Sequence, residues 1–435
     1  MKSRYHSIPR NLFDALASGG GGPEAIGALA AAEYSKHALL LRGVLAAAQA
    51  AGATQARFAG IGWEVLTEVE RRDRGVAAWV TRYPAVAAWA VDTLRGPGTD
   101  GGPPKAARLA AVAAAAAVRC GIDAEVPVLP VAGTVSLPSL GVARVDADSA
   151  VISSRPGSAE IRWAHGRVEI PPGGHQDAPG WRGVRDCQAG GLEVVIDDLD
   201  PFRMPSVDGL APRLTSGEAL NWQRVLRRGW QVLTAVHPAV AAEVAATISV
   251  IVPLSNSVHG HLSSSSPDTF GAVAMSEPPD SDTCASTLTH EMQHMKLCAV
   301  LDIVRLTLPD DGRRYYAPWR DDPRPVAGLL QGAYAHVGVT EFWRRRRQNA
   351  PGAARLRADG EFALWRAGTA RAIDTLLLSN RLTTAGADFV QRMSQTASSW
   401  TSEPVSAQAR AFARGKAGSH LARWEQHHGR VPGPA

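Results

Sequence analysis

Apolar residues recur at helical spacing in the first part of the chain. Positions at three- to four-residue steps include Leu39, Leu40, Val44 and Ala47. Stretches rich in glycine and proline, such as SGGGGPEA and RGPGTDGGPP, separate these segments and are typical of loops between helices. The pattern predicts a helical N-terminal region over residues 1–123.

The pattern changes in the middle of the chain. Short apolar pieces such as VPVLPVAGTVSL, IRWAHGRVEI and GGLEVVIDDLD, bounded by Gly, Pro, Asp and Ser, predict a small antiparallel sheet within a β-rich region over residues 124–205. Helical spacing resumes at GEALNWQRVLRRGWQVLTAVHP, and residues 206–435 add two short strand segments, ATISVIVPL and FGAVAMS, and further helices. We therefore predict an α+β fold that is predominantly helical.

Composition narrows the class of protein. With 435 residues of which 45% are hydrophobic, the chain can bury a large core in about two or three domains. The four cysteines form no C-x-x-C pair, which argues against a disulfide framework, a cysteine zinc site and an iron–sulfur cluster. The chain shows no secretory signal, and its most apolar run, LAAVAAAAAV, is far shorter than the roughly 20 residues of a membrane span. The widely spaced cysteines fit a reducing cytoplasm, and the lack of a long apolar run predicts no membrane partner. A net charge of +5 favours acidic partners only weakly, so we expect no nucleic-acid partner.

The segment STLTHEMQHMKL contains His290, Glu291 and His294 in the order H-E-x-x-H. Asp280 or Ser281 can cap a helix there, and on a helix the two histidines lie one turn apart on the same face. They can converge on one metal ion. The C-terminal region, residues 206–435, is therefore predicted to bind a metal.

The third ligand decides between chemistries. A metzincin is excluded because Leu297 and Val300 stand where its glycine and third histidine belong. Glu341 could complete a thermolysin-like site. We favour His336, which follows Gly332 at a four-residue step on a predicted helix, with a core histidine bonded to a carbonyl as the alternative. Three neutral imidazoles leave half of an octahedral shell open, as suits a redox iron, although they also suit zinc.

Two other polar segments are candidates for binding. In RRYYAPWRDDPRP, Arg320 or Arg324 could hold the distal carboxylate of a dicarboxylic cosubstrate; the alternative is that they pair with the adjacent aspartates and brace the loop. The three aspartates of VIDDLDPFR resemble a metal cluster, but their place at the end of a strand favours a turn with Asx hydrogen bonds.

Four segments together resemble a known family: LFDALASGGGG, VVIDDLDPFRMP, FGAVAMSEPPDSDTCASTLTHEMQHMKLCAVLDIV and YYAPWRDDPRPVAGLLQGAYAHVGVTEFW. They look like the HExxH-domain proteins of peptide natural product pathways, which are 2-oxoglutarate-dependent peptide β-hydroxylases. The resemblance runs from about residue 10 to 425 and is most specific between Phe270 and Trp343.

The resemblance implies an iron(II) dioxygenase that uses 2-oxoglutarate to hydroxylate a side-chain β-carbon of a ribosomally made precursor peptide. His290 and His294 match the motif histidines, and His336 is our third ligand. Because family members occur beside radical enzymes, a radical SAM enzyme of the same pathway is a further candidate partner. The strand FGAVAMS could hold the peptide along its edge.

Two other functions remain open at this level. One is a zinc metallopeptidase in which Glu291 is the general base; in a hydroxylase Glu291 would instead orient a ligand or shape the oxygen site. The other is a subunit that binds a precursor peptide without catalysing a reaction.

Overall fold

The computed structural model describes residues 6–96, 105–205, 207–256 and 260–431. The chain forms two compact units, each made of segments that are separated in sequence. The first unit contains residues 1–30, 228–247 and 279–435, and the second contains residues 31–227 and 248–278. This division differs from the three consecutive regions expected from the sequence pattern, because each unit takes segments from both halves of the chain.

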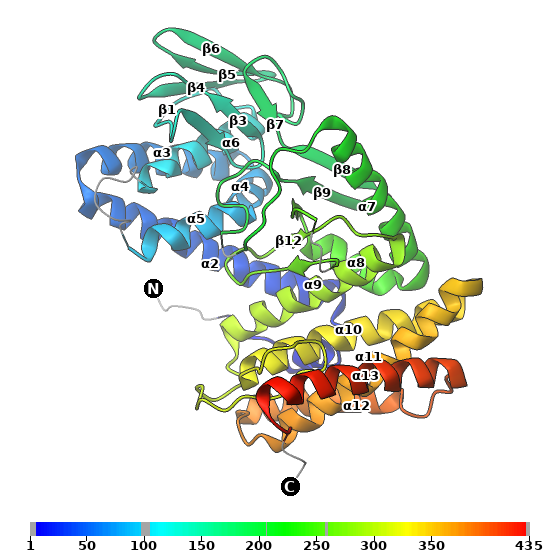
Figure 1. Ribbon diagram of the computed structural model, residues 1–435. Coiled ribbons are helices and arrows are strands. Elements are labelled where there is room, and N and C mark those ends of the chain that lie inside the picture. Colours follow the sequence, from blue (N-terminus) through cyan, green and yellow to red (C-terminus); the bar gives the residue numbers. More distant parts are fainter. Residues whose placement is uncertain (1–5, 97–104, 206, 257–259, 432–435) are drawn as a thin grey trace. The chain divides into compact units, whose positions relative to one another are not determined.

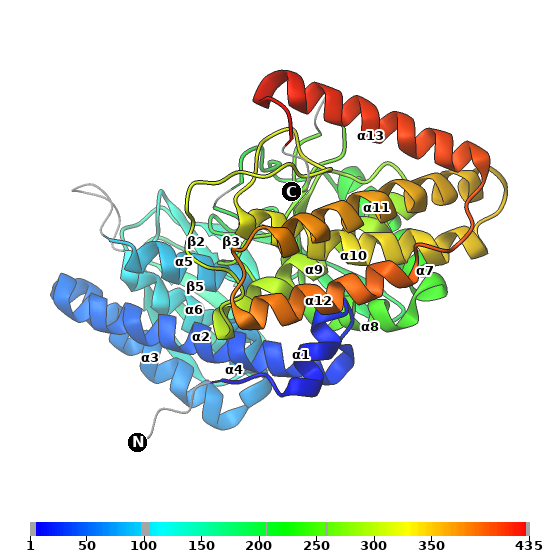
Figure 2. The ribbon, with the colours of Figure 1, turned by 90° about the horizontal axis from the view of Figure 1, so that it is seen from below.

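The first unit is helical. Its helices are α1 (Arg10–Ala17), α8 (Pro238–Thr247), α9 (Ser281–Ile303), α10 (Val326–Asn349), α11 (Gly352–Leu378), α12 (Thr384–Ser399) and α13 (Ala407–His428), with the start of α2 (Gly22–Ala51) and the end of α7 (Ser216–Val236). Helix α10 packs between α9 and α11, as Figure 1 shows. Figure 2 shows α13 along the outer side of α11 and α1 beside α12. The H-E-x-x-H motif therefore lies on α9, with α10 packed against it.

The second unit contains the remaining helices and all the strands of the described residues. Its helices are α3 (Ala53–Arg72), α4 (Arg74–Thr81), α5 (Pro84–Leu94) and α6 (Leu109–Cys120), with a short 3₁₀ helix at Lys105–Arg108. The alanine side chains of α6 allow close packing: a Cβ added at Gly62 of α3 would lie 2.7 Å from the backbone of α6. One hydrophobic cluster joins α6 to the neighbouring strands.

The strands form three sheets. A four-stranded sheet has the order β1 (Ala124–Val128), β4 (Ala150–Arg155), β5 (Ser158–Trp163), β6 (Gly166–Ile170). A three-stranded sheet has the order β2 (Thr134–Leu137), β3 (Gly141–Arg144), β7 (Trp181–Gly183). A five-stranded sheet has the order β11 (Ser263–Ser264), β12 (Ala272–Met275), β10 (Val250–Pro253), β9 (Leu192–Ile196), β8 (Arg185–Ala189).

The α+β, mainly helical fold is confirmed, but the strands are arranged differently from the expectation. The first two sheets are antiparallel, whereas β10 pairs in parallel with both β9 and β12. Strand β12 is internal, because β11 covers its other side, and Val273 is fully buried. Because β11 pairs with Ala274 and Met275, this half of FGAVAMS does not offer a free edge to a peptide, and peptide binding along the rest of the strand stays a prediction. Within the described ranges, no helix has the length and apolarity needed to cross a membrane.

Candidate metal centre

Helix α9 brings two motif histidines into contact. Its N-cap is Asp280, whose side chain accepts a hydrogen bond of 2.8 Å from the backbone N–H of Thr283, as the sequence predicted. One turn separates His290 from His294, so their rings share a face, with centroids 4.7 Å apart. The two Nε2 atoms are 3.1 Å apart.

Helix α10 brings the third histidine to the same place. The ring of His336 lies 5.1 Å from that of His290, centroid to centroid, and the planes are nearly perpendicular. Its Nδ1 lies 2.8 Å from the backbone carbonyl of Gly332. Because only a protonated Nδ1 can donate to a carbonyl, the Nε2 atom of His336 carries the lone pair. A histidine bonded to a carbonyl in this way has the tautomer that metal ligands need.

The spacing of the nitrogen atoms fits a metal ion. With metal–nitrogen bonds of about 2.1 Å, two ligand nitrogens stand about 3.0 Å apart at a right angle and about 3.4 Å apart at a tetrahedral angle. The distance of 3.1 Å between the Nε2 atoms of His290 and His294 falls in this range. Rings on a shared ion have centroids about 4.5–5.2 Å apart by the same geometry, and both measured centroid distances agree.

A side chain of α10 sets the tautomer of His294. Its Nδ1 lies 3.1 Å from Oε1 of Gln331, while the amide nitrogen of Gln331 donates to the sulfur of Cys298 at 3.4 Å. The carboxamide oxygen accepts the Nδ1 proton and leaves Nε2 of His294 free to bind a metal. Gln331 was not predicted from the sequence, although it directly precedes Gly332.

Burial favours the neutral form of His290 and His336. Removal from water, together with the neighbouring His294, lowers the pKa of His290 to about 4, against a smaller opposing effect of Glu291. Burial and the nearby His290 also place the pKa of His336 well below its usual value. Neutral imidazoles are the form that binds metals at pH 7.

The three rings form a partial cluster. Among the residues that the structure describes, no group of three or more His, Cys, Asp or Glu side chains has the arrangement of a preformed metal site. His290 contacts both other rings and therefore lies at the centre of the cluster. The assignment of His290, His294 and His336 as metal ligands stays a prediction, which the donor chemistry and spacing fit.

Two tryptophans enclose His336. The indole of Trp319 stacks on its ring, with centroids 4.2 Å apart and planes 14° apart, and the indole of Trp365 lies at 4.8 Å. A Cβ added at Gly332 would come within 2.4 Å of the Trp319 indole, so only glycine allows this stacking. The segment RRYYAPWRDDPRP is dense in aromatic residues, but its local pattern does not predict that Trp319 covers a histidine.

Two glycines of α10, Gly328 and Gly332, do not lie against another helix. Gly328 faces the guanidinium of Arg324 and Gly332 faces Trp319, so both accommodate the loop before the helix. The close approach of α10 to α9 occurs instead at Gly338, where an added Cβ would lie 2.7 Å from the side chain of Gln293.

The two candidate cosubstrate residues share one carboxylate. Nε of Arg320 donates to Asp322 at 2.6 Å, and a terminal nitrogen of Arg324 donates to the other oxygen of Asp322 at 2.9 Å. Asp321 instead lies 3.5 Å from His420. These contacts fit the alternative in which Arg320 and Arg324 brace the loop, with Asp322 as their shared partner. Arg324 differs from Arg320 in having a buried Nε without a hydrogen bond.

The two glutamates considered as alternatives have different surroundings. Glu341 accepts hydrogen bonds from Arg344 at 3.1 Å and Arg345 at 2.6 Å, and it lies 3.8 Å from His237. The carboxylate of Glu341 is therefore paired with arginines, and these contacts do not connect it to the histidine cluster. Glu291 is buried beside His290, with 2% of its surface exposed.

A buried ion pair fixes α9 on another side. The ammonium of Lys296 lies 2.6 Å from Glu243 of α8 and donates to the carbonyls of Gly19 and Gly20, while the N–H of Gly22 donates to the same glutamate. This contact gives a structural role to the segment LFDALASGGGG. The available signal was a single lysine beside the apolar run LCAVL of α9, from which no partner could be predicted.

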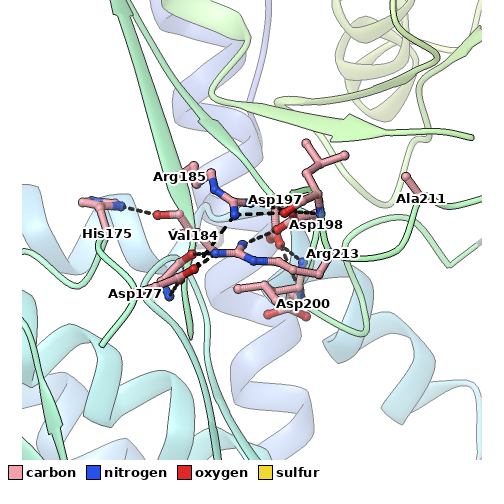
Figure 3. A network of polar contacts seen from close by, with 12 residues as sticks. His175, Asp177, Val184, Arg185, Asp197, Asp198, Asp200, Ala211 and Arg213 are labelled. Carbon is pink, nitrogen blue, oxygen red and sulfur yellow. Dashed lines mark hydrogen bonds and ion pairs between the residues drawn. The ribbon is translucent and has the colours of Figure 1, made fainter. Parts of the chain in front are cut away.

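The aspartates of VIDDLDPFR lie in the second unit and form a self-contained network (Figure 3). Asp197 accepts hydrogen bonds from the N–H groups of Leu199 and Asp200, as predicted for Asx turns. Asp198 is bound by Arg185 and Arg213. Its charge is neutralised by protein groups, so this cluster is structural.

Comparison with known proteins adds no assignment: no protein-family model matches the chain, and no curated protein is found to resemble it.

Proposed function

We propose that this chain is an iron(II)- and 2-oxoglutarate-dependent oxygenase that hydroxylates a side-chain β-carbon of a ribosomally made precursor peptide in the cytoplasm. The observation that carries the proposal is that the ring of His290 contacts the rings of both His294 and His336, while the Nδ1 partners of those two histidines leave their Nε2 lone pairs available to a metal. The choice of oxygenase chemistry, and of a peptide with a radical SAM partner, rests on the family resemblance.

The bound iron, with 2-oxoglutarate and oxygen, would supply the oxidising chemistry that converts C–H into C–OH, one oxygen atom entering the product and the other entering succinate. The protein's own groups position and shield this centre. Gln331 and the Gly332 carbonyl orient two of the ligands. Trp319 and Trp365 keep water from His336.

Arg324 is the better of the two candidates for the distal carboxylate of 2-oxoglutarate. Its guanidinium lies against Gly328, one helical turn or about 6 Å from Gly332, whose carbonyl holds His336. Arg320 is exposed at the outer side of the loop. Arg324 would exchange part of its contact with Asp322 for the cosubstrate.

The test is reconstitution of the purified protein with iron(II) and 2-oxoglutarate under anaerobic conditions, followed by air. The substrate supplied is a candidate ribosomally made precursor peptide. We expect a product heavier by one oxygen atom and an equal amount of succinate, both absent for His336→Ala and for reactions without 2-oxoglutarate. Peptide cleavage that requires zinc but no cosubstrate would replace this proposal with a metallopeptidase. An unmodified peptide that still binds would indicate a binding subunit.

A further inference from the structure

The first unit contains a pocket on the far side of the tryptophans that enclose His336. The pocket has a volume of about 700 Å³ and lies between α11, α13 and the loop before α10. Figure 2 shows α13 running along α11 there. Trp319 and Trp365 line the pocket, and each also contacts the ring of His336. The candidate metal centre and the pocket thus share a wall of two indoles.

The apolar part of the pocket suits a large side chain. Besides the two indoles, the wall contains Leu364 and Phe412. Phe412 is 40% exposed, which is a high value for an aromatic side chain. A volume of about 700 Å³ lies within the range of ligand pockets, about 300–1,000 Å³, and holds an aromatic side chain together with its neighbouring backbone.

The polar part of the pocket is mostly basic. Helix α13 contributes Lys416 and Arg423, both exposed, while α11 contributes Glu361. The carboxylate of Glu361 is already engaged, because it accepts a hydrogen bond of 2.7 Å from the indole N–H of Trp365. Within the described residues, no carboxylate lies at ion-pair distance from Lys416, whereas Arg423 lies 3.9 Å from Asp321. Lys416 also acts on the charge of Glu361, but the two cations Lys416 and Arg423 outnumber this one carboxylate in the pocket, so a ligand carboxylate is favoured near Lys416.

We propose that this pocket binds a segment of the peptide substrate in which a large aromatic side chain is followed by an acidic residue. The aromatic ring lies against Trp319 and Trp365, and the carboxylate pairs with Lys416 on α13. That the bound peptide is the substrate rests on the proposed function. The preference for an aromatic side chain and a carboxylate rests on the pocket's own residues. The pocket would hold the peptide next to the indoles that cover His336, so that a different residue of the same peptide reaches the metal centre.

The test uses glycines of α13 as a matched pair. Gly415 lines the pocket and Gly418 does not, and a Cβ added at either position meets nothing within 4 Å. Leucine favours a helix over glycine by roughly 0.5–1 kcal/mol, so both leucine variants should fold. Gly415→Leu would place a side chain in the pocket and obstruct part of it, whereas Gly418→Leu controls for the change in helix propensity.

Calorimetric titration of the metal-free protein with acetyl-Gly-Phe-Asp-Gly-amide gives the readout. We expect Gly415→Leu to bind at least about tenfold more weakly, and Gly418→Leu to match the unmodified protein within about twofold. Replacing Phe by Ala in the probe should weaken binding as strongly as Gly415→Leu. Equal affinity of the two leucine variants, or no binding by the unmodified protein, would overturn the proposal.

A charge reversal tests the carboxylate. Lys416→Glu should weaken binding of the Asp probe by about threefold to fivefold, as an exposed ion pair predicts, and leave the matching Asn probe within about twofold. Arg414→Glu, on the opposite side of the exposed helix, is the control. Because the protein is metal-free, binding without later oxygen insertion would reject the proposed function alone. Hydroxylation that is unaffected by Gly415→Leu would reject the pocket alone.

Discussion

Two clusters of potential metal ligands in this protein differ in whether other protein groups already occupy the ligand atoms. In the second unit, Asp198 is paired with arginines, so its charge is neutralised by the fold. In the first unit, the ring of His290 contacts those of His294 and His336, and the partners of the Nδ1 atoms of His294 and His336 leave lone pairs on their Nε2 atoms. A cluster that satisfies its own charges is structural, whereas a cluster with converging lone pairs can bind a metal.

The largest expected effect comes from breaking the aspartate network. Asp198→Ala leaves the guanidinium groups of Arg185 and Arg213 without their shared buried partner, and we expect a loss of about 3–5 kcal/mol in the free energy of unfolding. Denaturant titration measures this loss. The affinity for iron(II) should stay within about twofold of that of the unmodified protein. If added metal stabilised the unmodified protein but not Asp198→Ala, the aspartates would bind metal and the comparison would fail.

Removal of a histidine from the first unit should instead lower the affinity for a metal ion. We expect His336→Ala to lower the affinity for iron(II) or cobalt(II) by at least about 100-fold, because two protein ligands hold a divalent ion much more weakly than three. Metal titration followed by absorbance of cobalt(II) measures this change, with His175→Ala in the second unit as the control. Unchanged metal affinity in His336→Ala would leave His336 as a core histidine.

A smaller effect is expected from the residue that orients His294. Gln331→Ala removes the acceptor of the Nδ1 proton and should reduce metal affinity by about 10–100-fold. Gln331→Glu keeps an acceptor oxygen at the same place and should restore most of the affinity. Equal losses in the two variants would show that Gln331 acts through packing rather than through its hydrogen bond.

The smallest effect concerns Asp197. Burial and the nearby charge of Asp200 raise the pKa of Asp197 above its usual value. The unfolded chain therefore loses this proton at lower pH than the folded protein, so the contribution of Asp197 to stability falls as pH rises through that window. Asp197→Asn should change stability at pH 7 by less than about 1 kcal/mol and remove this pH dependence. Urea titrations from pH 3 to pH 7 test both; a large loss would show that the ionised form is required.

Local patterns determined much of this structure. Asp280 as N-cap, one turn between His290 and His294, and the start of α10 after Pro325 follow from capping chemistry and helical periodicity, which act within a few residues. The Asx turn at Asp197 is local in the same sense. The sequence alone therefore determined where α9 and α10 begin and which side of α9 carries the histidines.

Only the tertiary structure decided which distant groups meet. Gly332 provides space for Trp319 rather than for a helix, and Lys296 reaches Glu243 and the glycine-rich segment near the N-terminus. Strand β12 is internal because the short strand β11 covers it. These contacts depend on the packing of segments far apart in the chain, and the periodicity of one segment carries no information about its distant partner.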